Sequence, residues 1–509
     1  MTVERGVTGD KFILAIDQGT TGTTGLIFDA DGRVVSRAYR EVAQLYPQPG
    51  WVEHDPRELL ETSLAVAREA RDRAGIGLDR VAAVGIANQR ETTVVWERDS
   101  GRPVSNAIVW QCRRTAPLCE ELKERGLGQQ IVDKTGLVID AYFSATKLRW
   151  LLDNTPDGQE RASNGQLLFG TVDSWLVWNL TGGAVHATDY TNAARTMLFN
   201  IHDLRWDPDM LAALEIPEAM LPAVFPSAHL FGEVAAGMLG DQSLPLAGIA
   251  GDQQAALFGQ ACFETGMTKN TYGTGSFVLM NTGRVAVRSV HGLVTTLAAA
   301  TNDRPAYALE GSIFITGAAV QWLRDGLGII SEAAESEALA LSVADNGGVY
   351  FVPAFVGLGA PHWDMYARGT IVGLTRGSGR GHIARATLEA IAYQTRDVVE
   401  AMTAESGLAP SLLRVDGGGT ANDFLMQFQA DILGVPIQVA EIVETTALGA
   451  AQLAGLTVGV WHDLPQLAGS WRPSRSFEPA MSADQRDSLY DGWRRARERA
   501  GDWARPRRP

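Results

Sequence analysis

Residues 12–21, near the start of the chain, read FILAIDQGTT, a short apolar run that ends in a small polar loop. A run of this kind is typical of a buried strand. A second apolar run, GLIF (residues 25–28), follows it. Asp31 and Gly32 then supply a tight turn, because glycine tolerates a positive φ, and Val34 begins a returning strand. The opening therefore predicts a strand, a polar loop and a hairpin.

A helix follows this hairpin, and its boundaries are marked in the sequence. Asp55 can cap the first turn, Pro56 suits the first helical position, and Glu58 completes a capping box. Gly75 ends the apolar periodicity, and residues 81–86 again have the pattern of a buried strand. Strands that alternate with helices predict α/β architecture.

The second half of the chain repeats this opening in outline. TYGTGS (residues 271–276) is another small polar loop, residues 277–280 form another apolar run, and residues 281–283 have a turn composition. Thr274 follows Thr20 at a spacing near half the length of 509 residues. This spacing indicates two related domains, each with a phosphate loop. Chance recurrence of Gly/Thr turns is the alternative.

Length and composition limit the class of protein. A chain of 509 residues with 45% hydrophobic and 20% charged residues has a globular composition and room for several domains. The net charge of −15 argues against nucleic acid or an anionic membrane as the main partner. The sparse cysteines and the absence of a long apolar run predict a cytoplasmic protein with no stable membrane insertion.

Three loops share a chemistry that suits phosphate. They are DQGTT (residues 17–21), YGTGS (residues 272–276) and DGGGT (residues 416–420). Small residues let backbone N–H groups approach an anion, and hydroxyl groups add further donors. The carboxylate of Asp17 would repel a phosphate unless a cation intervened, which suggests Mg²⁺. Each loop alone is as well explained as a plain turn, but the three together favour a nucleotide.

Other polar residues follow predicted strands and leave two explanations open. Asp252 is either a general base at a strand end or the N-cap of the next helix, and the pattern alone favours the cap. Arg90 and Glu91 either bind a polyhydroxyl substrate or form a surface ion pair. Trp110 either packs on the carbon face of a sugar or lies in a core.

Longer motifs resemble those of glycerol kinases, which are members of the FGGY family. These motifs are WVEHDP (51–56), NQRETT (88–93), NAIVWQCRRT (106–115), GIAGDQQAALFGQ (248–260), YGTG (272–275), QWLRD (321–325), GLGAPHWD (357–364) and ANDFLMQFQADILG (421–434). The phosphate loops are shared with the broader sugar-kinase, actin and Hsp70 superfamily, whereas NQRETT together with VWQCRRT is narrower. The resemblance runs from about residue 11 to about residue 465.

The resemblance implies an α/β fold of two ribonuclease-H-like domains with an interdomain cleft. Residues 11–259 would form the N-terminal domain with the glycerol cage and the first phosphate loop, residues 260–465 the nucleotide-binding C-terminal domain, and residues 466–509 a C-terminal extension. The implied activity is ATP-dependent phosphorylation of glycerol to sn-glycerol 3-phosphate, in glycerol uptake and catabolism. The implied protein is a homodimer or homotetramer that uses Mg²⁺.

The resemblance also assigns residues, position by position. Asp252 would be the general base, and Asp17 would serve Mg²⁺. The glycerol cage would comprise Arg90, Glu91, Trp110, Tyr142, Asp252, Gln253 and Phe277. The nucleotide site would comprise Thr20, Thr21, Gly22, Thr274, Gly317, Gln321, Gly418 and Asn422. The sequence departs from the family at Thr24, where glycerol kinases usually carry an arginine that contacts the phosphates.

Two other functions share these phosphate loops. One is a kinase of another polyol, such as erythritol, on the same fold. The other is an actin-like ATPase or binding module, which has no use for a glycerol cage. Dependence of ATP turnover on an acceptor distinguishes the kinases from the ATPase.

Overall fold

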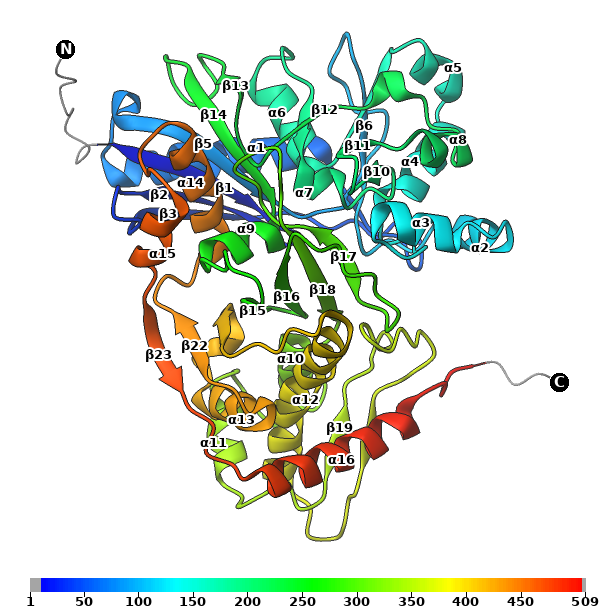
Figure 1. The fold of residues 1–509 in the computed structure, drawn as a ribbon, viewed down its shortest axis with the longest axis vertical. Coiled ribbons are helices and arrows are strands. Elements are labelled where there is room, and N and C mark those ends of the chain that lie inside the picture. The colour runs from blue at the N-terminus through cyan, green and yellow to red at the C-terminus, as the bar shows by residue number, and fades with distance from the viewer. Residues whose placement is uncertain (1–10, 506–509) are drawn as a thin grey trace. The chain divides into compact units, whose positions relative to one another are not determined.

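The computed structural model describes residues 11–505, which divide into two units (Figure 1). The first unit comprises the chain up to Ala261 together with Thr295–Tyr307 and Thr445–Ser470. The second unit comprises Cys262–Val294, Ala308–Glu444 and the chain from Trp471 onward. Each unit is built around its own large β-sheet.

A six-stranded sheet forms the centre of the first unit, in the order β13-β14-β5-β1-β2-β3. Its strands are β1 (Phe12–Gln18), β2 (Gly22–Phe28), β3 (Val34–Glu41), β5 (Val81–Asn88), β13 (Ala228–Val234) and β14 (Leu244–Gly251). Strands β1, β5 and β14 run parallel, whereas β2, β3 and β13 are antiparallel to their neighbours. The predicted strand, loop and hairpin at the start of the chain are therefore confirmed.

Helices and short strand pairs surround this sheet. The helices are α1 (Pro56–Ala74), α2 (Ala116–Glu124), α3 (Gly128–Thr135), α4 (Ser144–Asp153), α5 (Gly158–Ser163), α6 (Val172–Leu180), α7 (Tyr190–Ala193), α8 (Pro208–Ala213), α9 (Asp252–Gly259), α14 (Thr445–Thr457) and α15 (Leu464–Ser470). The short strands pair as β4 (Glu53–His54) with β7 (Ala107–Ile108), β6 (Val94–Glu97) with β8 (Leu167–Gly170), β9 (Ala187–Asp189) with β12 (Ala223–Phe225), and β10 (Phe199–Asn200) with β11 (Arg205–Trp206).

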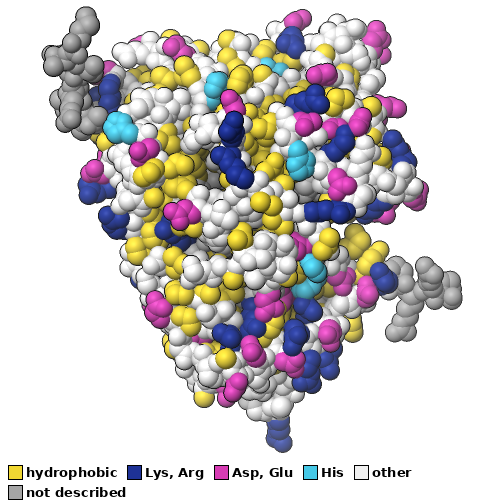
Figure 2. Space-filling view, viewed as in Figure 1, with side chains coloured by type: hydrophobic (Ala, Val, Ile, Leu, Met, Phe, Trp, Pro, Cys, Tyr) yellow, Lys and Arg dark blue, Asp and Glu magenta, His cyan; other side chains and the backbone are white. Residues whose placement is uncertain are grey.

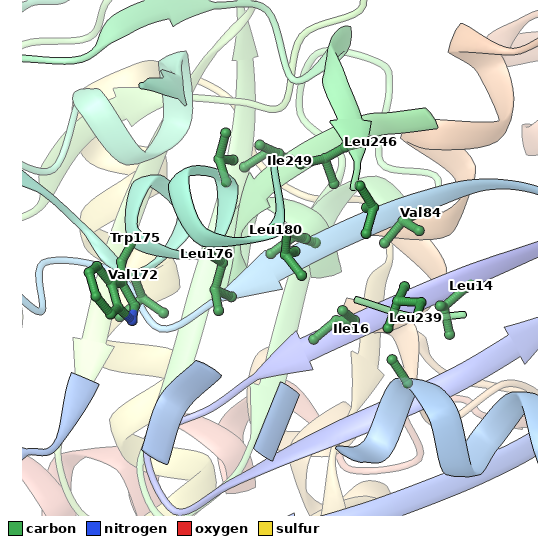
Figure 3. Packing of buried hydrophobic residues seen from close by; sticks show 14 of the residues in the cluster. Leu14, Ile16, Val84, Val172, Trp175, Leu176, Leu180, Leu239, Leu246 and Ile249 are labelled. Atoms are coloured by element: carbon green, nitrogen blue, oxygen red, sulfur yellow. The ribbon is translucent and has the colours of Figure 1, made fainter. Parts of the chain in front are cut away.

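The two faces of this sheet are covered in different ways. On one face, side chains of the central strands pack with those of α6 in a continuous apolar core, which includes Leu14, Val84, Trp175 and Leu246 (Figure 3). On the other face α14 lies close to the strands, because Gly85 and Gly248 have no side chains. A Cβ at Gly248 would come within 2.4 Å of the α14 backbone. Successive strand residues point to opposite faces, which accounts for this division.

The sheet of the second unit has the strand order β18-β16-β15-β21-β22-β23. Its strands are β15 (Thr268–Tyr272), β16 (Ser276–Gly283), β18 (Tyr307–Ile313), β21 (Leu413–Asp416), β22 (Ile437–Ala440) and β23 (Pro473–Phe477). Most of β17 (Val294–Leu297) lies in the segment Thr295–Tyr307 of the first unit. The other elements of the second unit are α10 (Gly317–Asp325), α11 (Glu335–Leu341), β19 (Tyr350–Val352), β20 (Thr370–Val372), α12 (Arg380–Ser406), α13 (Asp423–Leu433) and α16 (Ala483–Ala500).

The two sheets share one strand order. In the first unit a hairpin, β1 and β2, is followed by the parallel strands β5 and β14. In the second unit the hairpin β15 and β16 is followed by the parallel strands β21 and β22. The loop that contains Thr20 joins β1 to β2, and the loop that contains Thr274 joins β15 to β16. The two loops thus occupy equivalent places, as expected for duplicated ribonuclease-H-like domains.

The division of the chain differs from the predicted domains at its C-terminal end. The first break, after Ala261, lies close to the predicted boundary at residue 260. Residues 445–465 were expected in the second domain and residues 466–470 in the extension, but both belong to the first unit. Helix α14 is rich in small residues and approaches α9 through Gly449. Residues 466–509 are not a separate extension. Strand β23 extends the second sheet beside β22, and α16 buries Trp493 in the core of that unit.

Helix α1 begins and ends where the sequence predicts, but its capping box is absent. Asp55 caps it by accepting a hydrogen bond from the Arg57 amide, and Gly75 ends it in the left-handed conformation. Glu58 does not return to the cap; its Oε1 accepts a hydrogen bond from the Ala43 amide, which follows β3. The glutamate therefore joins the helix to the sheet.

Charge and hydropathy of the described residues agree with a globular exterior. Lys and Arg side chains are interspersed with Asp and Glu side chains on the face shown in Figure 2. Cys112, Cys119 and Cys262 are all buried, and among the described residues none of them forms a disulfide. Among residues 11–505, helices fall short of the length and apolarity needed to cross a membrane.

Candidate active site

The residues that are predicted to bind the phosphoryl acceptor lie together at the carboxyl ends of two neighbouring strands. Strands β5 and β14 are parallel, and Asn88 at the end of β5 pairs with Gly251 at the end of β14. Arg90 and Glu91 follow the first strand, and Asp252 follows the second. In open α/β sheets, ligands bind at the carboxyl ends of strands.

Arg90 connects the residues of this cluster. Its Nε lies 3.1 Å from Asp252 Oδ1, and its Nη1 donates a 3.1 Å hydrogen bond to Gln254 Oε1. The Arg90 side chain is only 2% exposed, whereas that of Asp252 is 28% exposed. The arginine is thus a buried residue that orients the aspartate, and the aspartate is the solvent-accessible residue of the pair. The alternative of a surface ion pair at Arg90 and Glu91 is therefore wrong.

Asp252 is oriented but retains an open oxygen. Gly251 is the N-cap of α9, so Asp252 is the first helical residue and not the cap. Its Oδ1 accepts a 2.7 Å hydrogen bond from the Gln253 amide in addition to the contact with Arg90. Within residues 11–505, both contacts of this carboxylate fall on Oδ1. Oδ2 can therefore accept a hydrogen bond from an acceptor hydroxyl.

Glu91 is fixed through both its side chain and its backbone. Arg195, which follows α7, places its Nε 2.5 Å from Glu91 Oε1, and both side chains are almost fully buried. Glu91 has a φ of 61°, which is uncommon for a residue with a Cβ. Non-glycine residues in this conformation concentrate at functional sites, where the surrounding structure enforces them.

Two aromatic residues of the predicted cage lie against each other. The ring centroids of Trp110 and Tyr142 are 5.5 Å apart in an edge-to-face arrangement. The Tyr142 amide donates a 2.8 Å hydrogen bond to Asp140 Oδ1, and Arg113 holds the Asp140 carboxylate. Trp110 Nε1 donates a 2.8 Å hydrogen bond to Thr20 Oγ1 in the first phosphate loop. The cage and this loop are therefore physically joined.

The first phosphate loop is a tight turn. The Gly19 amide donates a 2.9 Å hydrogen bond to the Gly22 carbonyl, and Thr21 lies exposed at the tip. A Cβ at Gly22 would come within 2.3 Å of the Tyr39 hydroxyl oxygen, so a larger residue there would require the Tyr39 side chain to move. Asp17 and Thr24 are directly paired on adjacent strands and therefore share a face of the sheet. Thr24, where the family usually has arginine, is buried.

A histidine behind this loop belongs to its support. His54 on β4 is fully buried, and Gln89 Nε2 lies 3.3 Å from its Nδ1. Gln89 also donates to Gln18 Oε1 and to the Gly19 carbonyl. Burial lowers the pKa of His54 to about 4, although a hydrogen bond to the Thr20 backbone opposes the shift. His54 is therefore neutral near pH 7.

The nucleotide residues expected in the second unit lie on its equivalent loops. The loop with Thr274 is bonded to the start of α10, since the Gly317 amide donates a 3.0 Å hydrogen bond to the Gly273 carbonyl. Gln321 lies exposed one turn further along α10. Gly418 is exposed in the loop after β21.

The remaining two residues of the second unit have different settings. Asn422 caps α13, because its Oδ1 accepts a 2.8 Å hydrogen bond from the Leu425 amide. Phe277 lies on β16, beside the phosphate loop of the second unit. Gln253, by contrast, lies in α9 of the first unit beside Asp252. The predicted cage residues are thus distributed between the units, with Phe277 in the second and the others in the first.

Several residues of the cluster carry no signal in the sequence. Arg195 forms the ion pair with Glu91, Gln254 accepts from Arg90, and Lys147 donates to the backbone carbonyls of Glu91 and Tyr142. Except for the contact of Lys147 with Tyr142, these contacts join segments far apart in the chain, so local patterns do not reveal them.

Comparison with known proteins identifies the class of enzyme. The models of the FGGY family of carbohydrate kinases match residues 12–259 with the N-terminal domain and residues 268–458 with the C-terminal domain. The chain belongs to the FGGY family of carbohydrate kinases.

This FGGY kinase is similar to glycerol kinases along nearly its whole length. It is 62% identical to glycerol kinase of Symbiobacterium thermophilum and 61% identical to glycerol kinase 2 of Thermotoga maritima, in each case over 97% of this chain and 99% of the relative. The structure of Plasmodium falciparum glycerol kinase with ADP is 38% identical and superimposes with a TM-score of 0.90, covering 96% of this chain and 98% of that one. The expected two-domain sugar-kinase fold is thereby confirmed.

Proposed function

We propose that this FGGY kinase transfers the γ-phosphoryl group of ATP to a primary hydroxyl of glycerol, which yields sn-glycerol 3-phosphate and ADP. The observation that carries this proposal is the buried Arg90, which orients the accessible carboxylate of Asp252 next to the buried Glu91–Arg195 pair. The identity of about 60% to glycerol kinases supports glycerol as the acceptor.

Asp252 acts as the general base in this reaction. Its Oδ2 accepts the proton of the attacking hydroxyl as the glycerol oxygen forms a bond to the γ-phosphorus and the bond to the ADP oxygen breaks. Phosphoryl transfer has a loose transition state, so the enzyme contributes mainly by positioning and by neutralising charge. The buried Arg90 orients this carboxylate through its contact with Oδ1.

Specificity for glycerol derives from hydroxyl recognition. Glycerol has little apolar surface, so discrimination depends on polar groups that stay unsatisfied when a hydroxyl is missing. In the proposed cage Arg90, Glu91, Tyr142, Asp252 and Gln253 bind the hydroxyls, while Trp110 and Phe277 contact the carbon chain. A buried and already paired Glu91 suits this role, because its carboxylate is oriented before a substrate binds.

The proposed nucleotide ligands are Thr20, Thr21 and Gly22 in the first unit and Thr274, Gly317, Gln321, Gly418 and Asn422 in the second. Asp17 would hold Mg²⁺, which would supply positive charge to neutralise the phosphates. The donor set fits this ion, since Mg²⁺ is usually held by one or two carboxylates together with substrate phosphates. Asp17 lies at the loop end of β1, on the same face as Thr24.

The cellular setting is part of the same proposal. The enzyme acts in the cytoplasm as a homodimer or homotetramer, in glycerol uptake and catabolism. Its acidic net charge of −15 argues against nucleic acid as a partner. Thr24 in place of the usual arginine lowers affinity for the nucleotide without abolishing turnover.

Product analysis separates this function from the two alternatives. Purified enzyme is incubated with Mg-ATP and, in separate reactions, with glycerol, erythritol, xylitol or D-xylulose, and the phosphorylated product is identified by phosphorus NMR. The proposal predicts glycerol 3-phosphate and the highest kcat/KM for glycerol. A higher kcat/KM for erythritol would reassign the acceptor. Inorganic phosphate as the only product would favour an actin-like ATPase.

A further inference from the structure

Lys147 on α4 is a fully buried lysine that lies beside the proposed cage. Its Nζ donates hydrogen bonds to backbone carbonyls of Tyr142, Phe143 at 3.0 Å and Glu91 at 3.4 Å. Within residues 11–505 it forms no ion pair, and its burial lowers its pKa to about 7. A buried amine without a carboxylate partner is costly, so its retention needs a reason beyond packing.

The hydrogen bond from Lys147 to Glu91 is one of several that fix the backbone of Glu91. The Glu91 carbonyl accepts from Thr93 Oγ1 at 3.0 Å and from Ser144 Oγ at 3.1 Å, in addition to Lys147. These donors converge on a residue with a φ of 61°, a conformation that is unfavourable without external support. The direction of the Glu91 peptide is therefore set by side chains from two separate segments.

The hydrogen bond from Lys147 to Tyr142 helps to fix the backbone of Tyr142. Its carbonyl accepts from Lys147, and its amide donates to Asp140 Oδ1 at 2.8 Å. Arg113 holds Asp140 in turn. Thr93 and Ser144 contact the carbonyl of Glu91 alone, whereas Lys147 contacts the carbonyls of both Glu91 and Tyr142. Lys147 is thus a bridge between the two segments.

We infer that Lys147 is a positioning residue that sets the separation of Glu91 and Tyr142 and so limits the size of the acceptor. It touches neither substrate; it acts through the two backbones that carry the proposed glycerol ligands. The inference rests on the proposed function and adds a determinant of acceptor selectivity that lies outside the cage itself.

The test compares KM and selectivity in Lys147→Met, which keeps the length of the side chain and removes its donors. We expect KM for glycerol to rise about 10- to 100-fold, because displacement of a binding group by about 1 Å has effects of this size. KM for ATP should change less than twofold, and the ratio of kcat/KM for glycerol to that for erythritol should fall about tenfold.

Two further variants make the test decisive. Ser144→Ala removes one donor from the Glu91 carbonyl and should raise KM for glycerol by a smaller factor, which provides a reading if Lys147→Met does not fold. Lys134→Met is the matched control, because Lys134 pairs with Asp207 and Asp209 in another part of the first unit. It should lower thermal stability and leave both KM values unchanged.

The outcomes separate this inference from the proposed function. Wild-type enzyme without glycerol-dependent ADP release would overturn the proposed function, and the inference with it. Active wild type together with Lys147→Met and Ser144→Ala variants that keep the glycerol KM and the erythritol ratio would overturn the inference alone. A fall in thermal stability with unchanged kinetics would assign Lys147 a purely structural role.

Discussion

Trp110 Nε1 donates a 2.8 Å hydrogen bond to Thr20 Oγ1. The tryptophan belongs to the proposed glycerol cage, and the threonine belongs to the first phosphate loop. The ring of Trp110 also lies edge-to-face against Tyr142, with centroids 5.5 Å apart. The Trp110 side chain therefore connects the proposed glycerol-binding residues with a loop that is proposed to bind the phosphates of ATP.

Removal of this bond should affect both substrates. Trp110→Phe keeps an aromatic ring but removes the Nε1 donor. A neutral hydrogen bond is worth about 1 kcal/mol, so KM for glycerol and KM for ATP should each rise by about fivefold. Thr20→Val should have a similar effect on ATP. In the double variant the losses should not add, because both changes remove the same bond. Fully additive losses would show that the bond does not couple the two sites.

Asp252→Asn tests the proposed base. The amide keeps the shape and the contact of Oδ1 with Arg90 but does not accept a proton. The value of kcat should fall by about 10²- to 10⁴-fold, while the dissociation constant of ATP stays within twofold. Steady-state kinetics and calorimetric titration with a non-hydrolysable ATP analogue measure the two quantities. Near-normal kcat would remove Asp252 from the chemical step.

Arg195→Met should destabilise the first unit. Loss of the arginine removes the 2.5 Å ion pair of the buried Glu91 and leaves its longer 3.9 Å contact with Arg90, and breaking a buried pair costs about 3–5 kcal/mol of unfolding free energy. The double variant Arg195→Met/Glu91→Gln should recover part of this loss. Lys123→Met is the control, since Lys123 and Glu120 form an exposed pair. Its effect should stay below about 1 kcal/mol. Equal losses of unfolding free energy in Arg195→Met and Lys123→Met would contradict the stabilising role of the buried Glu91–Arg195 pair.

His54 should make stability depend on pH. Its pKa is lowered from 6.5 to about 4, so the unfolded chain binds a proton between these values while the folded chain does not. The stabilisation is complete above pH 6.5 and is lost as the pH falls from 6.5 to about 4, by at most about 3 kcal/mol.

Denaturant unfolding at pH 7.5 and pH 5 measures this dependence. In His54→Gln the difference between the two pH values should be smaller than in wild type. The exposed His462→Gln should keep the wild-type difference. A His54→Gln variant with an unchanged pH dependence would show that His54 does not titrate in this range.

Local sequence signals account for much of each sheet. The apolar runs and small polar loops predict β1, β2, β15 and β16, and Asp55 and Gly75 mark the ends of α1. The return of α14 to the first unit was not predictable in this way. It depends on a close approach to Gly85 and Gly248, which lie far from α14 in the sequence.

The site was predictable to the extent that its residues fall in motifs. Arg90 and Glu91 could be proposed because they follow a strand in NQRETT. Their true partners, Asp252 and Arg195, could not be assigned from spacing, because each pair is formed only when separate segments fold together. For the same reason the local pattern alone favours Asp252 as an N-cap over a general base, whereas the structure shows Gly251 in the N-cap position.

The most direct test of the account is the initial rate of ADP release from Mg-ATP, measured with saturating glycerol and without any acceptor. The account predicts rapid release with glycerol and a negligible rate without it, since water does not replace the bound hydroxyl at Asp252. An equal rate in the two reactions would contradict the assignment of this protein as a glycerol-phosphorylating enzyme.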